Sequence, residues 1–176
     1  MRAEVVDEII AALREAGVAF ACYVPDSWLA DVERRLHEEP DFTVVPVVNE
    51  GEGVAMCAGA WLGGKRSVML MENSGVRMAC EELARLGLNN GVPVFMLMPY
   101  RGDIGDWPTW APPHGWTMEP VLQALRVQYR IIRRFDEIRP AIVGAPRTQS
   151  AGRTHVAVIF GIELCVDGKR LTSAGE

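Results

Sequence analysis

The sequence predicts a three-layer α/β/α fold around a central, mostly parallel six-stranded sheet. Short continuous apolar runs alternate with segments of helical periodicity along the chain. Strands that are apolar throughout, rather than at every second residue, indicate a parallel sheet covered on both faces. A length of 176 residues allows one sizeable core but not two ordinary domains. We therefore expect one domain at residues 1–162 and a C-terminal tail at 163–176 that is partly disordered.

The first elements can be justified one by one. Val5, Ile9 and Leu13 recur every four residues and predict a helix that Gly17 closes. An apolar strand follows at once, and helical spacing returns at Trp28. The predicted strands are residues 18–24, 43–48, 67–71, 94–98, 128–132 and 155–160, and the predicted helices are residues 4–16, 28–36, 50–62, 75–88, 118–126 and 135–146.

The connection at residues 99–117 is longer than compact domains usually have. It contains Trp107, Trp110 and Trp116. Tryptophan is normally buried, and a loop needs a groove or a partner surface to bury three of them. We favour a partner surface and keep packing within this domain as the alternative. Whether this loop is a lid or a subunit interface stays open.

Composition and charge exclude several classes of protein. The formal net charge of −5 argues against a nucleic-acid or membrane-surface partner, since both need clustered positive charge. The N-terminus does not resemble a signal peptide, and no apolar stretch approaches the roughly 20 residues of a membrane span. Four cysteines lie far apart without metal-ligand spacing, as free thiols in a reducing compartment do. We expect a cytoplasmic protein and no metal site in this chain.

Glu50 is the strongest site candidate from the pattern alone. It follows the apolar run 43–48, so it stands at the carboxyl edge of a parallel sheet, where open α/β folds bind ligands. Small residues such as Gly51 and Gly53 follow and permit close approach of a backbone or a flat ligand. The alternative is a capped helix, with Asn49 as N-cap and Glu52 completing a capping box.

Four short segments, each just after a predicted strand, carry a resemblance to a known family. They are Val24-Pro25-Asp26-Ser27, Asn49-Glu50-Gly51-Glu52-Gly53-Val54-Ala55, Glu72-Asn73-Ser74-Gly75 and Tyr100-Arg101-Gly102. Together they resemble the pyrimidine-binding domain of thiamine diphosphate enzymes, most closely the alpha subunits of sulfopyruvate decarboxylase and the matching half of phosphonopyruvate decarboxylase. The resemblance covers residues 4–160, is most specific around Glu50, and implies the thiamine diphosphate-binding fold of the pyrimidine type.

The resemblance implies roles for individual residues. Glu50 would hydrogen-bond a ring nitrogen of the cofactor pyrimidine and so activate the cofactor. Asp26 would help to protonate the reaction intermediate, with a turn or N-cap aspartate as the alternative. Pro25, Asn73, Ser74 and Gly75 would lie beside the cofactor, with Ser74 as a helix cap in the alternative interpretation.

The long loop suggests how a substrate could be held. Arg101 and His114 would suit a substrate with a second anionic group. This chain nevertheless departs from the family pattern, with Glu72 where glutamine is common and Val76-Arg77-Met78 after Gly75 where small residues and asparagine are usual. The stretch 106–114 also differs from the usual acidic, histidine-containing one, so the substrate could differ from sulfopyruvate and phosphonopyruvate.

A second half of the cofactor site is missing from the sequence. In this family a Gly-Asp-Gly segment, followed some thirty residues later by asparagine, holds the diphosphate and its Mg²⁺. Neither Asp103-Ile104-Gly105-Asp106 nor Val166-Asp167-Gly168-Lys169 fits that pattern. We expect a separate diphosphate-binding beta subunit that holds Mg²⁺, with thiamine diphosphate bridging the two chains in a heterotetramer or larger assembly.

These observations lead to one main functional hypothesis. The chain is the alpha subunit of a heteromeric thiamine diphosphate-dependent decarboxylase that converts a 2-oxo acid to an aldehyde and CO2. A carboligase with the same cofactor and a catalytically silent scaffold or regulatory subunit are the alternatives. A flavodoxin-like nucleotide binder is less well supported, because no glycine-rich phosphate loop follows the first strand.

Overall fold

The computed structural model describes residues 1–166 of the chain. Six strands form one sheet in the order β2-β1-β3-β4-β6-β5, and every neighbouring pair is parallel. The strands are β1 (Val18–Tyr23), β2 (Thr43–Pro46), β3 (Arg66–Leu70), β4 (Phe95–Pro99), β5 (Gln128–Ile132) and β6 (Val156–Phe160). The sheet expected to be mostly parallel is therefore parallel throughout the described residues.

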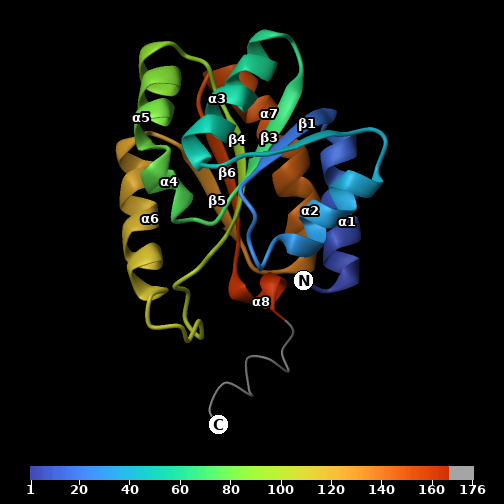
Figure 1. Cartoon of the computed structure of the whole chain (residues 1–176), viewed down its shortest axis with the longest axis vertical. Helices are drawn as coiled ribbons and strands as arrows, with labels where there is room; N and C mark the ends of the chain where they lie inside the picture. Colours follow the sequence, from blue (N-terminus) through green and yellow to red (C-terminus); the bar gives the residue numbers. More distant parts are fainter. Residues whose placement is uncertain (167–176) are drawn as a thin grey trace.

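Helices cover both faces of this sheet (Figure 1). The longer ones are α1 (Ala3–Glu15), α2 (Ala30–Glu38), α3 (Glu50–Leu62), α6 (Pro112–Ala124) and α7 (Ile138–Gly152), and the short ones are α4 (Gly75–Met78), α5 (Cys80–Leu83) and α8 (Ile162–Cys165). The cores contain α1, α2 and α7 on one face and α3 to α6 on the other. The predicted three-layer α/β/α architecture is confirmed.

Strand β4 shows why the sheet needs two covering layers. All five of its residues are buried. Phe95 and Leu97 belong to the core under α1 and α7, whereas Met96 and Met98 belong to the core under α3 and α6. Because neighbouring side chains point to opposite faces of a strand, a continuous apolar run requires apolar contacts on both sides.

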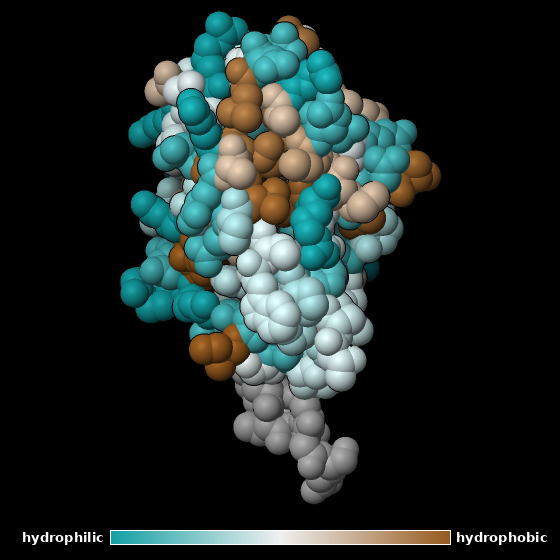
Figure 2. All heavy atoms as spheres, turned by 90° about the vertical axis from the view of Figure 1, so that its left-hand side faces the viewer, coloured by the Kyte–Doolittle hydropathy of each residue, from teal (hydrophilic) through white to brown (hydrophobic). Residues whose placement is uncertain are grey.

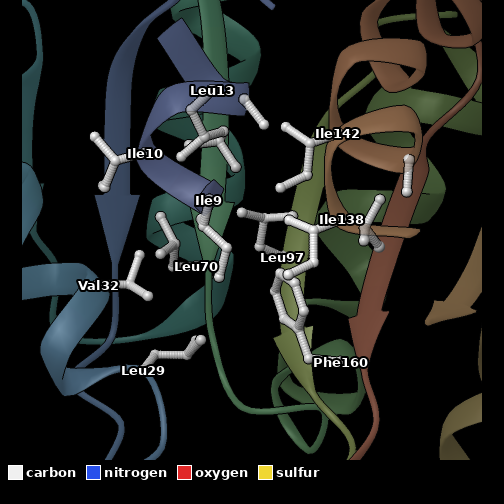
Figure 3. Packing of buried hydrophobic residues seen from close by; sticks show 14 of the residues in the cluster. Ile9, Ile10, Leu13, Leu29, Val32, Leu70, Leu97, Ile138, Ile142 and Phe160 are labelled. Carbon is white, nitrogen blue, oxygen red and sulfur yellow. The ribbon is translucent and has the colours of Figure 1, made fainter. Parts of the chain in front are cut away.

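The core of the first face packs α1, near the start of the chain, against α7, near its end. Ile9 and Leu13 of α1 lie opposite Ile138 and Ile142 of α7, above strand residues that include Leu97 (Figure 3). Burial of each such side chain contributes about 1.5–3 kcal/mol to folding. The other face carries α4, α5 and α6, and hydrophobic residues gather on part of its outer surface (Figure 2).

The helix predicted at 75–88 is divided into three pieces. It forms α4, α5 and a π-helix at Ala84–Asn89, and Ala79, with φ −90° and ψ 12°, breaks the regular dihedrals between α4 and α5. Helix α6 starts at Pro112 rather than 118, because prolines are tolerated in the first turn, where a backbone N–H has no helical partner. The long loop is correspondingly shorter than predicted.

Two further differences lie toward the C-terminus. Helix α7 continues to Gly152 rather than 146, and a 3-10 turn at Phe135–Glu137 precedes it. Helix α8 occupies the start of the segment predicted as a tail, whereas residues 167–176, to which the expected disorder mainly applied, lie outside the described residues. Across residues 1–166, no helix has both the length and the apolar character needed to cross a membrane.

The π-helix coincides with a buried histidine. His155 Nδ1 accepts a hydrogen bond from the Val94 N–H at 2.9 Å, and His155 Nε2 lies 2.9 Å from the Leu83 carbonyl oxygen. The ring is therefore neutral with its proton on Nε2, which it donates to Leu83. This bond engages a carbonyl at the junction of α5 and the π-helix, and Gly87 lies so close to the ring that a side chain there would collide with it.

His155 predicts a pH-dependent stability. Burial lowers the pKa of His155 below its usual value of about 6.5. The neutral His155 ring therefore contributes its full stabilisation of the fold above about pH 6.5. This stabilisation is lost as the pH falls, because a second ring proton, on Nδ1, would face the Val94 N–H. We expect urea unfolding to show a free-energy advantage of wild type over His155→Gln of about 1–3 kcal/mol near neutral pH that shrinks toward about pH 5.

Comparison with the variant at each pH is essential, because Glu33 acts in the opposite direction. Burial raises the pKa of Glu33 to about 7, so its protonation stabilises the fold as the pH falls. This contribution is common to both proteins and cancels in the difference. A difference that stays constant across the pH range would contradict the role assigned to His155.

Candidate active site

The strand order places a change of connection direction at the carboxyl edge of the sheet. Strand β1 lies between β2 and β3, and the connections through α2 and α3 run on opposite faces of the sheet. The loops that follow β1 and β3 therefore diverge, which is the arrangement in which open α/β sheets form ligand sites. The turns containing Asp26, Glu50, Glu72 and Arg101 follow β1, β2, β3 and β4, as the sequence predicted.

Glu50 is the first residue of α3, and its neighbours supply the helix cap. Asn49 Oδ1 accepts a hydrogen bond from the Glu52 N–H at 2.9 Å, and Glu52 Oε2 accepts one from the Val48 N–H at 3.1 Å. Capping therefore explains Asn49 and Glu52. Glu50 lies instead against Gly75, where an added Cβ would come within 2.5 Å of Glu50 Cγ and 3.0 Å of its Oε1.

The other small residues of α3 allow close packing within this domain. A Cβ at Gly53 would collide with Met69 of β3, and one at Gly51 would lie 2.7–2.9 Å from the carboxylate of Glu82. The glycines thus bring α3 directly onto β3 and α5. Gly75, which lies outside α3, instead leaves room for the Glu50 side chain itself.

Asp26 closes the turn between β1 and α2. Its Oδ1 accepts hydrogen bonds from the N–H groups of Trp28 and Leu29 at 2.9 and 3.0 Å, which is the turn-capping geometry of the alternative interpretation. Burial raises the pKa of Asp26, and the nearby Glu72 carboxylate raises it further, whereas Arg101 lowers it. An aspartate in this setting keeps its proton to higher pH than usual.

Sequence reasoning missed Glu33, which lies behind Asp26. Glu33 is 7% exposed, and its Oε1 accepts a hydrogen bond from the Asp26 N–H at 3.1 Å. Burial raises its pKa to about 7, and repulsion by Asp26 adds to the effect. One signal was available, because Glu33 stands four residues after Leu29 on the stripe that α2 turns toward the core.

The residues after β3 form a bridge to β4. Asn73 is fully buried and donates through Nδ2 to the Arg101 carbonyl at 2.9 Å, while its Oδ1 accepts from the Arg101 N–H at 3.2 Å. Ser74 donates its hydroxyl to Glu72 Oε1 at 2.6 Å and caps no backbone group. Pro25 is exposed just before Asp26.

The guanidinium of Arg101 is enclosed on all sides. Its Nε and Nη2 donate to the two carboxylate oxygens of Asp106 at 2.8 and 3.2 Å, and its Nη1 lies 4.0 Å from Glu72 Oε2. The rings of Trp28 and Trp110 cover it, with centroids 4.3 and 4.4 Å from Cζ. The Arg101 side chain is 5% exposed and that of Asp106 is fully buried.

His114 reaches the same cluster from α6. Its Nδ1 lies 3.0 Å from Glu72 Oε1 but lacks the alignment of a hydrogen bond. Its ring meets Trp110 edge-on at 5.4 Å between centroids. Arg101 and His114 therefore both lie beside Glu72, which the sequence singled out only as a departure from the family pattern. Their predicted role in binding a substrate stays a prediction.

The three tryptophans of the long connection remain partly uncovered. Trp107 is 54% exposed, Trp110 49% and Trp116 73%. Packing within this domain therefore covers at most about half of each ring. In residues 1–166, no three histidine, cysteine, aspartate or glutamate side chains converge in a way that could hold a metal ion.

Comparison with known proteins adds the family context. No family model matches the chain. The chain is 31% identical to sulfopyruvate decarboxylase subunit alpha of Methanothermobacter thermautotrophicus, over 93% of this chain and 98% of that protein. The Methanococcus maripaludis subunit alpha is 28% identical, over 88% of this chain and 92% of that protein.

More distant similarities agree with this result. Phosphonopyruvate decarboxylase of Streptomyces viridochromogenes is 31% identical over 56% of this chain, which corresponds to 25% of that protein. The solved structure of 2-oxoglutarate:ferredoxin oxidoreductase from Magnetococcus marinus shares the fold, with a TM-score of 0.69 over 92% of this chain and 29% of that one, at 12% identity. The chain belongs to the family of sulfopyruvate decarboxylase alpha subunits.

Proposed function

We propose that this chain is the alpha subunit of a heteromeric thiamine diphosphate-dependent decarboxylase that converts a 2-oxo acid to an aldehyde and CO2. Its relatives are named decarboxylases, which supports the reaction class. The observation that carries the proposal is the position of Glu50, a carboxylate at the carboxyl edge of the sheet whose side chain packs against Gly75.

The residues around Glu50 fit the pyrimidine half of the cofactor. A pyrimidine ring needs a carboxylate at its edge, and Glu50, at the start of α3 and packed against Gly75, offers one. The Asn73 side chain makes two hydrogen bonds to the Arg101 backbone, and these fix the turn that leads to Gly75. When bound, thiamine diphosphate supplies the electron sink for the carbanion that decarboxylation leaves.

The side chains of this chain would then manage protons. Glu50 would hold a proton at a carboxylate oxygen and share it with a ring nitrogen of the pyrimidine. Asp26, whose pKa is raised by burial, would deliver a proton to the reacting carbon. Glu33, which accepts a hydrogen bond from the Asp26 N–H, would hold the Asp26 turn in place.

A partner chain would complete the site. The relatives are named as subunit alpha, which implies a partner subunit. We propose a beta subunit that binds the diphosphate and Mg²⁺, in a heterotetramer or larger assembly. The face formed by α4 and α6 is suited to meet it, because Met78 and Trp116 are 68% and 73% exposed there and hydrophobic residues gather on this side (Figure 2).

A conservative substitution tests the role of Glu50. Glu50→Gln keeps the size of the side chain but cannot exchange a proton, so we expect the reconstituted complex to lose decarboxylation by at least about 100-fold. The matched control is Glu52→Gln, which retains the capping function and should keep activity near the wild-type level. Equal turnover by Glu50→Gln and wild type would contradict a catalytic role for this chain and favour a scaffold subunit.

Cofactor binding tests the division of the site between two chains. We expect calorimetric titration of thiamine diphosphate with Mg²⁺ to show tight binding to the complex and little heat with this chain alone, because the diphosphate supplies much of the binding charge. Tight binding by the isolated chain would contradict the shared site. Identification of the product as a free aldehyde, rather than a carbon–carbon coupled ketone, separates decarboxylation from carboligation.

A further inference from the structure

Asp26 and Glu33 bring two carboxyl groups together at the start of α2. Glu33 Oε1 accepts a hydrogen bond from the Asp26 N–H at 3.1 Å. The Asp26 carboxylate in turn caps the N–H groups of Trp28 and Leu29. Glu33 is 7% exposed, whereas Asp26 is only half-buried. Glu33 therefore lies behind Asp26, largely closed to a ligand, and acts on the candidate site through Asp26.

Neither carboxyl group is paired with a cation. Within residues 1–166, no ion pair includes Asp26 or Glu33. The groups that face Asp26 from other elements are Glu72 after β3, Arg101 after β4 and Cys165 of α8, and Asp26 is the charged group that acts on Glu33. Two carboxyl groups that are buried together without a paired cation resist being charged at the same time.

Burial and mutual repulsion keep a proton on this pair to an unusually high pH. Burial, with a smaller contribution from the Asp26 carboxylate, raises the pKa of Glu33 to about 7, although the hydrogen bond from the Asp26 N–H favours the charged form. Burial also raises the pKa of Asp26. Groups that interact in this way lose their protons in steps that belong to the pair. The last proton therefore leaves near neutral pH, where a general acid is most effective.

We propose that Glu33 is a positioning residue of the candidate active site, which fixes the Asp26 turn and shares a proton with the Asp26 carboxyl group, so that the pair still holds one proton at neutral pH. The inference rests on the proposed function, in which Asp26 protonates the reacting carbon. In that step the Asp26 O–H bond breaks and a C–H bond forms. Both carboxyl groups are then charged, and water returns a proton to the pair.

Carbon-13 NMR of this chain tests the shared proton without a substrate. Glu33→Gln keeps an oxygen that can accept the Asp26 N–H but has no titratable proton, so it removes the charge and retains the turn. We expect the Asp26 carboxyl carbon of wild type to shift in two steps, the later one near pH 7, and Glu33→Gln to lose the later step. The matched control is Glu38→Gln, which removes a carboxylate from an exposed position of the same helix and should keep both steps.

The pH dependence of decarboxylation tests the consequence for the reaction. The complex with its partner subunit would be assayed with sulfopyruvate, phosphonopyruvate and pyruvate between about pH 5 and about pH 9. In wild type we expect kcat to fall above about pH 7, where the pair loses its last proton. In Glu33→Gln we expect kcat near neutral pH to fall about 10-fold with KM changed less than about 2-fold. This loss should disappear as the pH is lowered, because Asp26 then holds a proton by itself.

Each outcome decides the inference. A loss of kcat in Glu33→Gln that is equal at every pH, with Asp26 titrating as in wild type, would assign a purely structural role to Glu33 and overturn the proposal. Wild-type kinetics in Glu33→Gln would overturn it as well. Failure of the wild-type complex to decarboxylate any of the three acids would refute the proposed function. The carbon-13 titration would then still decide whether Glu33 and Asp26 share a proton.

Discussion

Hydrogen bonds that continue the parallel ladder beyond the strand ends hold the candidate site together. The Val24 N–H donates to the Leu70 carbonyl, the Met71 N–H to the Leu97 carbonyl, and the Val47 N–H to the Tyr23 carbonyl. Each bond extends a strand pair by one step toward the carboxyl edge of the sheet. The turns that carry Asp26, Glu50 and Glu72 thus begin at fixed positions relative to one another.

A buried ion pair between Arg101 and Asp106 rigidifies the loop that follows β4. Arg101 and Asp106 each pay a desolvation penalty that their paired hydrogen bonds and the two covering tryptophans offset. Such a pair adds little net stability but penalises any rearrangement that separates its members. The pair therefore holds the loop after β4 in a single arrangement.

A second buried polar group acts at a distance from the crevice. His155 engages the carbonyl at the end of α5, and Glu82 of α5 lies against Gly51, next to Glu50 in sequence. A shift of α5 would therefore displace the Glu82 side chain that packs against the first turn of α3. Glycines at the tight contacts, Gly87 on the histidine ring and Gly51 on the carboxylate, allow both approaches without a steric clash.

The sequence by itself determined the layers, the strand positions and the location of Glu50. Those features follow from local periodicity and from the rule that parallel strands end at one edge, so they need no knowledge of long-range contacts. It also supplied the cap formed by Asn49 and Glu52, which depends on neighbours along the chain. The start of α6 was misjudged, because prolines are tolerated in the first turn of a helix. The π-helix was also missed, and the carbonyl where it begins is engaged by His155, which is far away in the sequence.

Only the tertiary structure decided which charges are free. Arg101 and Asp106 are five residues apart, but Trp28, from another turn, completes the enclosure. The pairing of Asn73 with the Arg101 backbone spans 28 residues, and Glu33 meets Asp26 across the first turn of α2. Such contacts depend on the three-dimensional arrangement of strand ends, and a residue type alone does not show whether its charge is neutralised by a neighbour or left for a ligand.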